Sequence, residues 1–332
     1  MSNNVSESTL RQWVRGVREW LRDLRVQGVW RVVVATCASK WFFLRGVDIA
    51  ALLQDHPERS EQWDQPVVPA DNQTTSVPHI IFQTWKTRDQ LLPRFDYWSR
   101  TFRAQNPKWQ YVRWDDADNR AFIARDFPWF LPYYDGYPRE IFRADIVRLF
   151  FLFRFGGLYA DRDTQCLRPL EQDVLREGVT LGRFSADDSY DETYLNAIMA
   201  SSPGELFWLL AIAIAMEKYT GLAQEPGKPM PEFYTGPFII TEAARFYLKH
   251  SERTVGDRAQ GVIDQIDTKF LIRTNQLNVL PDERWCPVNW LNHVHTTFST
   301  EISRRGKVLP ERWLRWIFPR STLVTFWAHS WD

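Results

Sequence analysis

The sequence has few cysteines and no excess of charge of either sign, and each absence excludes a class of protein. Its 332 residues contain three cysteines, Cys37, Cys166 and Cys286, which are odd in number, far apart and free of any C-x-x-C spacing. A disulfide framework and a structural zinc site are therefore not expected. The 41 basic and 41 acidic side chains cancel, so no overall field draws the chain to nucleic acid. With 44% hydrophobic and 25% charged residues, the composition is that of a globular protein.

Long apolar runs and two common catalytic motifs are also missing. No stretch reaches the roughly 18 apolar residues that a membrane-spanning helix needs, and the best one, residues 28–38, is interrupted by Arg31. That stretch does not open the chain and lacks a cleavage site, so a secretory signal is not expected. The sequence has neither a Gly-x-x-x-x-Gly-Lys-Ser/Thr loop nor a Gly-x-Ser-x-Gly elbow, which argues against a P-loop NTPase and an α/β-hydrolase.

Tryptophan, by contrast, is plentiful. The chain has 17 tryptophans, and such a surplus often marks sugar-stacking surfaces, interfaces or membrane-surface belts. Residues 1–54 carry apolar and basic side chains at helical spacing, namely Leu10, Trp13, Val17, Trp20, Leu21 and Leu24 beside Arg11, Arg15, Arg18, Arg22 and Arg25. An amphipathic helix of this kind either lies in a lipid headgroup layer or packs on the main domain with a solvated basic face.

A linker and a catalytic domain are expected after this helical extension. Residues 55–76 are rich in proline, acidic side chains and a Thr/Ser cluster, which is typical of a linker. Beyond it, residues 77–84, 110–114 and 158–160 predict strands, and residues 140–155 predict a helix that is apolar on almost every side. The alternation indicates an α/β layered fold for residues 77–332. Further helices are expected over residues 205–219 and 241–249, with a turn over residues 234–237 between them.

An Asp-x-Asp pair follows the third predicted strand. Gly156-Gly157 ends the apolar helix, and the short strand after it stops at Asp161-Arg162-Asp163. In open α/β sheets, ligands bind beyond the carboxyl ends of strands, and two such carboxylates suit Mg²⁺ or Mn²⁺. A second pair, in Asp116-Ala117-Asp118, lies in a polar stretch and is expected to cap a helix. On a loop, Asp163 should contribute little to stability.

Charged residues also occur in the apolar helix before this pair. Asp145 and Arg148 are three residues apart and share one face, and buried charges cost several kcal/mol each unless they are paired. One interpretation is a core ion pair whose members satisfy only each other. The other is a fork of charged groups that binds the hydroxyls of a ligand. A metal bound by the two aspartates would neutralise the charge that develops on a diphosphate leaving group. Because the P-loop is absent, this chemistry favours a nucleotide-sugar transferase.

Four segments carry a specific resemblance, and they occur in order along the chain. They are residues 77–86 (VPHIIFQTWK), 127–131 (FPWFL), 143–148 (RADIVR) and 156–163 (GGLYADRD). Together they resemble glycosyltransferase family 32, which includes the fungal initiating α-1,6-mannosyltransferase and mannosyl-inositol-phosphoceramide synthase. The later two segments are also similar to the sugar-binding region of the large clostridial glucosylating toxins. The resemblance implies a GT-A type fold (a Rossmann-like mixed sheet flanked by helices), a divalent metal, Mn²⁺ or Mg²⁺, and retention at the anomeric carbon.

The resemblance also implies roles for individual residues. Asp163 would bind the metal directly, Asp161 would reach the ribose or a metal-bound water, and His329 would complete the metal or diphosphate site. Asp145 and Arg148 would bind hydroxyls of the donor sugar.

Other residues would surround the nucleotide and the reacting carbon. Gln83, Trp85 and Tyr159 belong to the implied donor site, with Trp85 stacking on the base and Trp331 closing over the nucleotide. Asn196 lies in a segment similar to the one that the family places near the reacting carbon. Thr235 and Gly236 resemble its small-residue loop beside the donor.

The expected activity is therefore transfer of a hexose, with mannose favoured, from GDP-mannose or a UDP-hexose to a glycan or lipid acceptor. The alternatives are a toxin-like protein glucosyltransferase that uses a UDP-sugar and a non-catalytic sugar- or nucleotide-binding relative. Arginine outnumbers lysine and no anchor is visible, so we expect a cytoplasmic enzyme, peripheral at the inner membrane face through its N-terminal helix. The Golgi lumen is the alternative location, and nucleic acid is not an expected partner.

Overall fold

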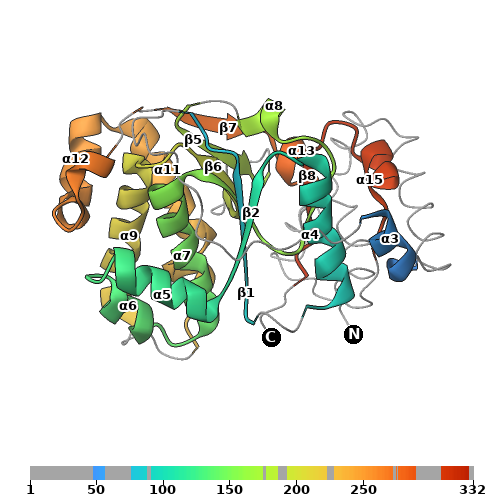
Figure 1. Cartoon of the computed structure of the whole chain (residues 1–332). Coiled ribbons are helices and arrows are strands. Elements are labelled where there is room, and N and C mark those ends of the chain that lie inside the picture. Colours follow the sequence, from blue (N-terminus) through green and yellow to red (C-terminus); the bar gives the residue numbers. More distant parts are fainter. Residues whose placement is uncertain are drawn as a thin grey trace, which may run out of the picture.

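The computed structural model describes residues 48–56, 76–87, 91–174, 177–185, 193–222, 228–271, 274, 276–288 and 308–328. A mixed six-stranded sheet runs through the middle of this part, with helices on both of its faces (Figure 1). The α/β class predicted from the sequence is confirmed, with the mixed sheet flanked by helices that the resemblance implied.

The sheet has the order β2-β1-β3-β6-β5-β7. The β1 strand pairs in parallel with β2 and β3, whereas β6 runs antiparallel to both of its neighbours. Every residue of β1, β3 and β6 is buried, as expected of strands covered on both faces. The strands are β1 Ile80–Trp85, β2 Gln110–Asp115, β3 Gly157–Ala160, β5 Val179–Arg183, β6 Tyr194–Ser201 and β7 Leu277–Leu280, and a second sheet pairs β4 Thr164–Cys166 with β8 Leu323–Thr325.

Two groups of helices lie on opposite sides of the sheet (Figure 1). The group drawn on the left contributes most of the largest hydrophobic cluster and comprises α5 Asp116–Asp126, α6 Leu131–Gly136, α7 Glu140–Phe155, α9 Leu206–Leu222, α10 Pro231–Tyr234, α11 Pro237–Lys249 and α12 Glu252–Ile263. The group on the right comprises α3 Ile49–Asp55, α4 Pro93–Gln105, α8 Glu171–Val174, α13 Asp282–Trp285 and α15 Glu311–Ile317. A 3-10 turn, η1, spans Thr268–Phe270.

The α7 helix has the predicted bounds, and 12 of its 16 residues are buried. It ends at Gly156, whose φ of 65° lies in the left-handed region that favours glycine. A Cβ at this position would lie 2.7 Å from the Ser201 carbonyl oxygen and from the Pro203 nitrogen. Glycine here therefore allows α7 to turn directly into β3, which carries the Asp-x-Asp pair at its end.

Two helix boundaries differ from those predicted. The α11 helix begins at Pro237 rather than at residue 241, because proline at the first helical position has its φ already set and no N–H to satisfy. The α9 helix begins at Leu206 and continues to Leu222. The Asp116–Asp118 pair lies in the first turn of α5 as expected, where Asp115 and Asp118 form a reciprocal capping box.

The α3 helix lies at the predicted boundary between the N-terminal segment and the linker. Its Ile49, Leu52 and Leu53 pack against the hydrophobic cluster shared by α4 and α15. His56, directly after α3, lies 2.9 Å from Glu311 and accepts a hydrogen bond from Arg100 through its carbonyl. The end of the N-terminal segment thus packs on the main domain, while residues 1–47 lie outside the described residues. In the described ranges, no helix is long and apolar enough to cross a bilayer.

Candidate donor-binding site

The predicted site lies at one edge of the central sheet. The β1 and β3 strands are parallel, so their carboxyl ends share this edge, and the antiparallel β6 begins beside them. The Asp161 N–H donates to the Ala197 carbonyl of β6 at 2.8 Å, and the Asp161 carbonyl accepts from Thr164 at 3.1 Å. Residues 161–163, the aspartate loop, are therefore hydrogen-bonded to β6 at Asp161 and form a tight turn that leads to Thr164.

Arg148 holds the site together from α7. Its guanidinium lies 2.7 Å from Oδ1 of Asp145 and 3.2 Å from Oδ1 of Asp161. It also donates to the Asn196 carbonyl at 2.8 Å, and the Asn196 amide donates to Oδ1 of Asp145 at 3.1 Å. Arg148 is 1% exposed. The structure thus brings together four predicted site residues from α7, β3 and β6, and the ion pair is part of a larger cluster.

Tyr159 supports the same cluster from within β3. Its hydroxyl donates to Oδ1 of Asp161 at 2.8 Å, and the Arg148 guanidinium lies 4.6 Å from its ring centroid. The ring is buried. Tyr159, predicted to bind the donor, therefore orients Asp161 and Arg148.

The charges of the cluster are adjusted by burial and by each other. Burial raises the pKa of Asp145 to about 7, although Arg148 acts in the opposite direction. Burial also raises the pKa of Asp161, and Arg148 and Tyr159 oppose the rise. Burial alone would lower the pKa of Arg148, but the charges of Asp161, Tyr159 and Asp145 outweigh it and raise that pKa. The guanidinium therefore stays charged and stabilises ionised carboxylates around it.

Asp163 connects the aspartate loop to the C-terminal part of the chain. Its Oδ2 accepts the Ala328 N–H at 2.7 Å, its Oδ1 lies 3.5 Å from the Thr325 hydroxyl, and its carbonyl accepts the Phe326 N–H at 3.0 Å. Burial and then the charge of Asp161 raise the pKa of Asp163 to about 7. The expectation that this loop carboxylate matters little to stability stays a prediction, and the contacts of Asp163 with the segment after β8 argue against it.

The two aspartates have the chemistry of a divalent-cation site. Both side chains are half-buried rather than enclosed, and the charge of Asp161 raises the pKa of Asp163. A cation would relieve this repulsion, and hard divalent ions prefer oxygen ligands. The described residues contain no cluster of three or more His, Cys, Asp or Glu side chains that could hold a metal. The predicted third ligand, His329, lies outside the described residues, as does Trp331.

Gln83 and Trp85 at the end of β1 are buried. The Gln83 amide donates to the Asp161 carbonyl at 3.1 Å and accepts from the Tyr111 hydroxyl at 2.6 Å. Trp85 is 8% exposed and packs against Phe95 at 4.7 Å between ring centroids. Gln83 therefore supports the backbone of the aspartate loop, and base stacking by Trp85 stays a prediction.

Thr235 and Gly236 form the junction between α10 and α11. Thr235 is buried and its N–H donates to the Pro231 carbonyl, while a Cβ at Gly236 would lie 2.7 Å from the Cα of Glu232. Glu232 is close enough to Asp145 for its charge to raise the pKa of that carboxyl. The small-residue loop thus brings α10 near the cluster, and its contact with a donor stays a prediction.

Two supporting residues were not predicted from the sequence. Arg162, between the two aspartates, is buried and donates to the Tyr111 hydroxyl at 3.1 Å. Tyr111 in turn donates to Gln83, so a chain of hydrogen bonds runs beneath the aspartate loop. The position of Arg162 between two aspartates is visible in the sequence, whereas its contact with Tyr111 of β2 could not be predicted from the sequence.

The part of the chain that carries most of this site matches a described family. Residues 93–180, which span α4 to the start of β5 and include Asp145, Arg148, Asp161 and Asp163, match the family described as "Glycosyltransferase sugar-binding region containing DXD motif". The predicted resemblance is confirmed.

Individual proteins are similar to parts of the chain. Over 100 residues the chain is 44% identical to inositol phosphoceramide mannosyltransferase 3 of Schizosaccharomyces pombe, covering 30% of this chain and 28% of that protein. It is 33% identical over 144 residues to the mannosyl phosphorylinositol ceramide synthase SUR1 of Saccharomyces cerevisiae, covering 41% and 34%. A solved chain titled PaToxG Glycosyltransferase aligns with a TM-score of 0.42 and 12% identity over 88% of this chain and 98% of that chain. The matched stretch thus spans about a third of the length of the curated relatives.

Proposed function

We propose that the chain is a metal-dependent, retaining glycosyltransferase of the GT-A type that moves mannose from a nucleotide-diphosphate sugar to a glycolipid acceptor. One observation carries the proposal. In the described part of the chain, Arg148 and Asn196 contact Asp145 at its Oδ1 atom. Arg148 and Tyr159 likewise contact Asp161 at its Oδ1 atom. The Oδ2 atom of each carboxylate is then left to accept a hydrogen bond from a ligand.

Such an arrangement suits a sugar with several hydroxyls. Arg148 holds both carboxylates in fixed positions, so each accepts a hydroxyl without reorganising when the donor binds. Asn196 fixes Asp145 from β6 and lies beside the same edge of the sheet. Because buried polar groups are costly to leave unpaired, a donor that lacked the correct hydroxyls would bind poorly.

The diphosphate of the donor would lie next to the sugar, at Asp161 and Asp163. A divalent cation bound there would neutralise the negative charge that develops on the leaving diphosphate. The proposed part of His329 in this site is supported by its neighbour Ala328, whose N–H donates to Asp163. The choice between Mn²⁺ and Mg²⁺ is an outcome of the experiment below.

The sugar and the acceptor are proposed from the relatives. Both matched proteins carry mannosyl transfer to an inositol-phosphate ceramide in their names, which favours mannose as the sugar and a phosphate-bearing glycolipid as the acceptor. A lipid acceptor is consistent with an N-terminal segment that lies on a membrane surface. On this proposal the enzyme works at a membrane face, cytoplasmic or lumenal.

A donor-hydrolysis screen tests the proposal. The full chain is incubated with GDP-mannose, UDP-glucose and UDP-galactose, with Mn²⁺, with Mg²⁺ and with a chelator, beside Asp161→Asn and the exposed control Asp257→Asn. We expect GDP-mannose hydrolysis that needs the metal, is lost in Asp161→Asn and is kept in Asp257→Asn. Wild-type rates in excess chelator, or hydrolysis of none of the donors, would contradict the activity. Preference for a UDP-hexose would instead support a toxin-like glucosyltransferase.

A further inference from the structure

Arg94, in the first turn of α4, has no part in the site as described so far. Its side chain is partly buried. In the part of the chain that the structure describes, its guanidinium forms no hydrogen bond or ion pair, and its buried Nε–H has no acceptor. Buried donors are normally paired. An arginine in this state therefore points to an anionic ligand.

The packing of α4 on β4 places Arg94 beside the aspartate loop. The Thr101 hydroxyl accepts the Cys166 N–H at 2.9 Å. One turn nearer to the start of the helix, the Tyr97 hydroxyl accepts from the Gln165 amide at 3.2 Å. The two segments thus run alongside each other, and each turn of α4 lies next to an earlier residue of β4. The next turn carries Arg94, and the chain directly before β4 is the aspartate loop.

Aromatic side chains fix the first turns of α4 at the same edge of the sheet. Phe95 packs against Trp85 at the end of β1, with 4.7 Å between ring centroids. Trp98 stacks on Phe326 at 4.9 Å, and the Phe326 N–H donates to the Asp163 carbonyl. In Figure 1 the lower end of α4, where the helix begins, accordingly lies near the lower end of β1. The start of α4 is therefore held at the donor-binding site from two sides.

The charge of Asp163 acts on Arg94. Burial lowers the pKa of Arg94, and the negative charge of Asp163 opposes this shift. The Asp163 carboxylate is hydrogen-bonded to the Ala328 N–H, and among the described residues no ion pair joins it to Arg94. The guanidinium thus lies in the field of the aspartate loop with its donors uncommitted. A diphosphate bound there through a cation would meet it as the next positive charge.

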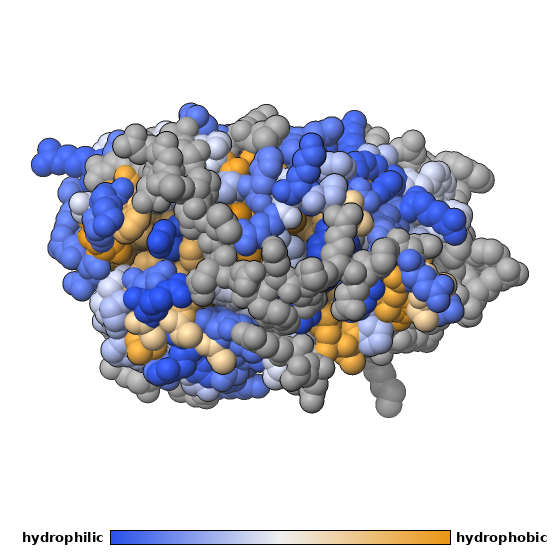
Figure 2. All heavy atoms as spheres, viewed as in Figure 1, coloured by the Kyte–Doolittle hydropathy of each residue, from blue (hydrophilic) through white to orange (hydrophobic). Residues whose placement is uncertain are grey.

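Apolar surroundings strengthen the attraction of this guanidinium for an anion. It lies 5.0 Å from the ring centroid of Phe95, which is fully buried. Leu92, two residues earlier, is 51% exposed, and Figure 2 shows hydrophobic surface at the lower right, where α3 and the start of α4 lie in Figure 1. Charges that are shielded less by water attract each other more strongly. The planar fork of an arginine also matches two oxygens of a phosphate group.

We propose that Arg94 binds the diphosphate of the nucleotide-sugar donor. The inference rests on the proposed glycosyltransferase function for the identity of the ligand, but not for the binding of an anion. It adds a positive group of the chain itself to the cation that Asp161 and Asp163 would hold. Because the free nucleoside diphosphate carries more negative charge than the donor, Arg94 should bind this product at least as tightly.

Calorimetry of the full chain tests the proposal without turnover. The probes are GDP, UDP and inorganic pyrophosphate, each with Mg²⁺, and the variants are Arg94→Gln and Arg94→Lys. The control is Arg253→Gln on the exposed surface of α12. We expect Arg94→Gln to weaken the preferred nucleoside diphosphate and pyrophosphate at least tenfold, as loss of a hydrogen bond to a charged group does. Arg94→Lys, which keeps the charge but not the fork, should weaken them less, and Arg253→Gln by less than twofold.

Melting temperatures and the variant Asp161→Asn complete the test. Arg94 has no hydrogen bond to lose within the described ranges, so Arg94→Gln should melt with the wild type. Undiminished binding in Arg94→Gln, or an equal loss in Arg253→Gln, would overturn the proposal, and loss of GDP binding in Asp161→Asn alone would leave the donor site standing. Pyrophosphate binding that depends on Arg94, without binding of either nucleotide, would overturn the proposed activity and leave the anion site. No binding of any probe would overturn both.

Discussion

Individual carboxylates in this chain differ in function because their surroundings differ. Asp118 caps a helix, Asp163 accepts a backbone N–H from Ala328 while lying beside Asp161, and Glu205 is enclosed with one oxygen unsatisfied among the described residues. Residue type alone does not separate these cases. Burial, hydrogen-bond partners and the nearest charge do, and each case makes its own prediction.

Replacement of Asp163 should separate its structural contribution from its proposed metal binding. Asparagine keeps an oxygen for the Ala328 N–H but loses the charge, whereas alanine loses both. We expect Asp163→Asn and Asp163→Ala to lose turnover alike. Only alanine should lose stability, by about 1–3 kcal/mol for a charged hydrogen bond. Urea unfolding with donor hydrolysis measures both effects, and full turnover in either variant would remove Asp163 from the metal site.

Glu205 should make stability depend on pH. It is fully buried, Thr274 donates to its Oε1 at 2.9 Å, and burial raises its pKa to about 7. Because the folded pKa lies above the unfolded value of about 4.3, its stabilising contribution is complete below pH 4 and is lost as pH rises through 7. We therefore expect Glu205→Gln to be more stable than the wild type at pH 8 by about 1–3 kcal/mol, relative to their difference at pH 4. Parallel stability curves for the two proteins across this range would contradict the prediction.

At the scale of elements, the junction between α7 and β3 sets the position of the aspartates. Gly156 has a left-handed φ of 65°, with no room for a Cβ between Ser201 and Pro203. We expect Gly156→Ala to destabilise the fold by about 2–4 kcal/mol, from backbone strain together with overpacking. Gly256→Ala in α12, where a Cβ would meet nothing within 4 Å, should instead stabilise by up to about 1 kcal/mol. Equal unfolding midpoints for the two variants would show that the junction tolerates a side chain.

The α3 helix allows the two interpretations of the N-terminal segment to be tested separately. Its Ile49, Leu52 and Leu53 pack on the main domain, so a deletion ending at residue 54 would remove packing along with any membrane contact. We expect deletion of residues 1–47 to keep the melting temperature and donor hydrolysis but to abolish flotation with anionic vesicles. Deletion of residues 1–56 should also lower stability, by about 3 kcal/mol for three partly buried apolar side chains. Unchanged flotation without residues 1–47 would contradict the membrane role.

At the scale of the whole molecule, local features of the site could be predicted and its long-range contacts could not. The bounds of α7, the glycines after it and the pairing of Asp145 with Arg148 follow from spacing within one helix. Arg148 also contacts Asp161 and Asn196, and Asp163 contacts Ala328 from 165 residues away. Those contacts depend on β6 lying antiparallel in the sheet and on β8 pairing with β4. The hydrophobic periodicity of the sequence predicts neither pairing.

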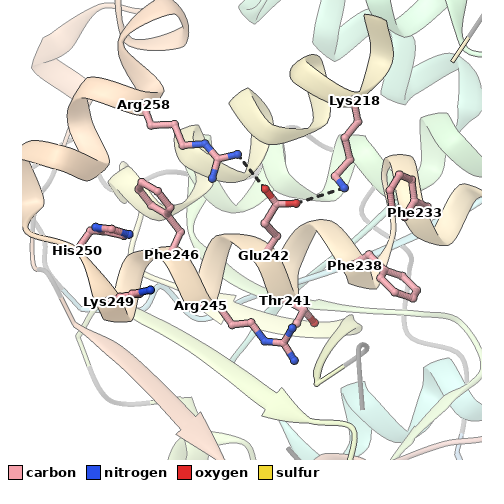
Figure 3. Close-up of a pocket in the computed structure, with 10 residues that line it drawn as sticks. All are labelled: Lys218, Phe233, Phe238, Thr241, Glu242, Arg245, Phe246, Lys249, His250 and Arg258. Carbon is pink, nitrogen blue, oxygen red and sulfur yellow. Dashed lines mark hydrogen bonds and ion pairs between the residues drawn. The ribbon is translucent and has the colours of Figure 1, made fainter. Parts of the chain in front are cut away.

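The same limit applies to a charged cluster among the helices. Glu242 of α11 lies 3.2 Å from Lys218 of α9 and 2.8 Å from Arg258 of α12 (Figure 3). The spacing of these residues along the chain gives no sign that they meet, because packing of the three helices brings them together. The sequence therefore predicted the aspartate pair from a local motif, whereas this cluster became visible only in the folded chain.

The double variant Asp145→Leu/Arg148→Met tests the central claim, that the buried cluster exists to bind the donor. If the two residues served only each other, apolar replacements of similar volume would be near neutral for stability and harmless to activity. Each charged hydrogen bond to the reacting sugar is worth roughly 1.5–3 kcal/mol, or about ten- to a hundredfold in rate. Because Arg148 also pairs with Asp161 and donates to the Asn196 carbonyl, we predict a folded variant with a lowered melting temperature, and donor turnover reduced at least a hundredfold. Wild-type turnover in a folded double variant would contradict the account.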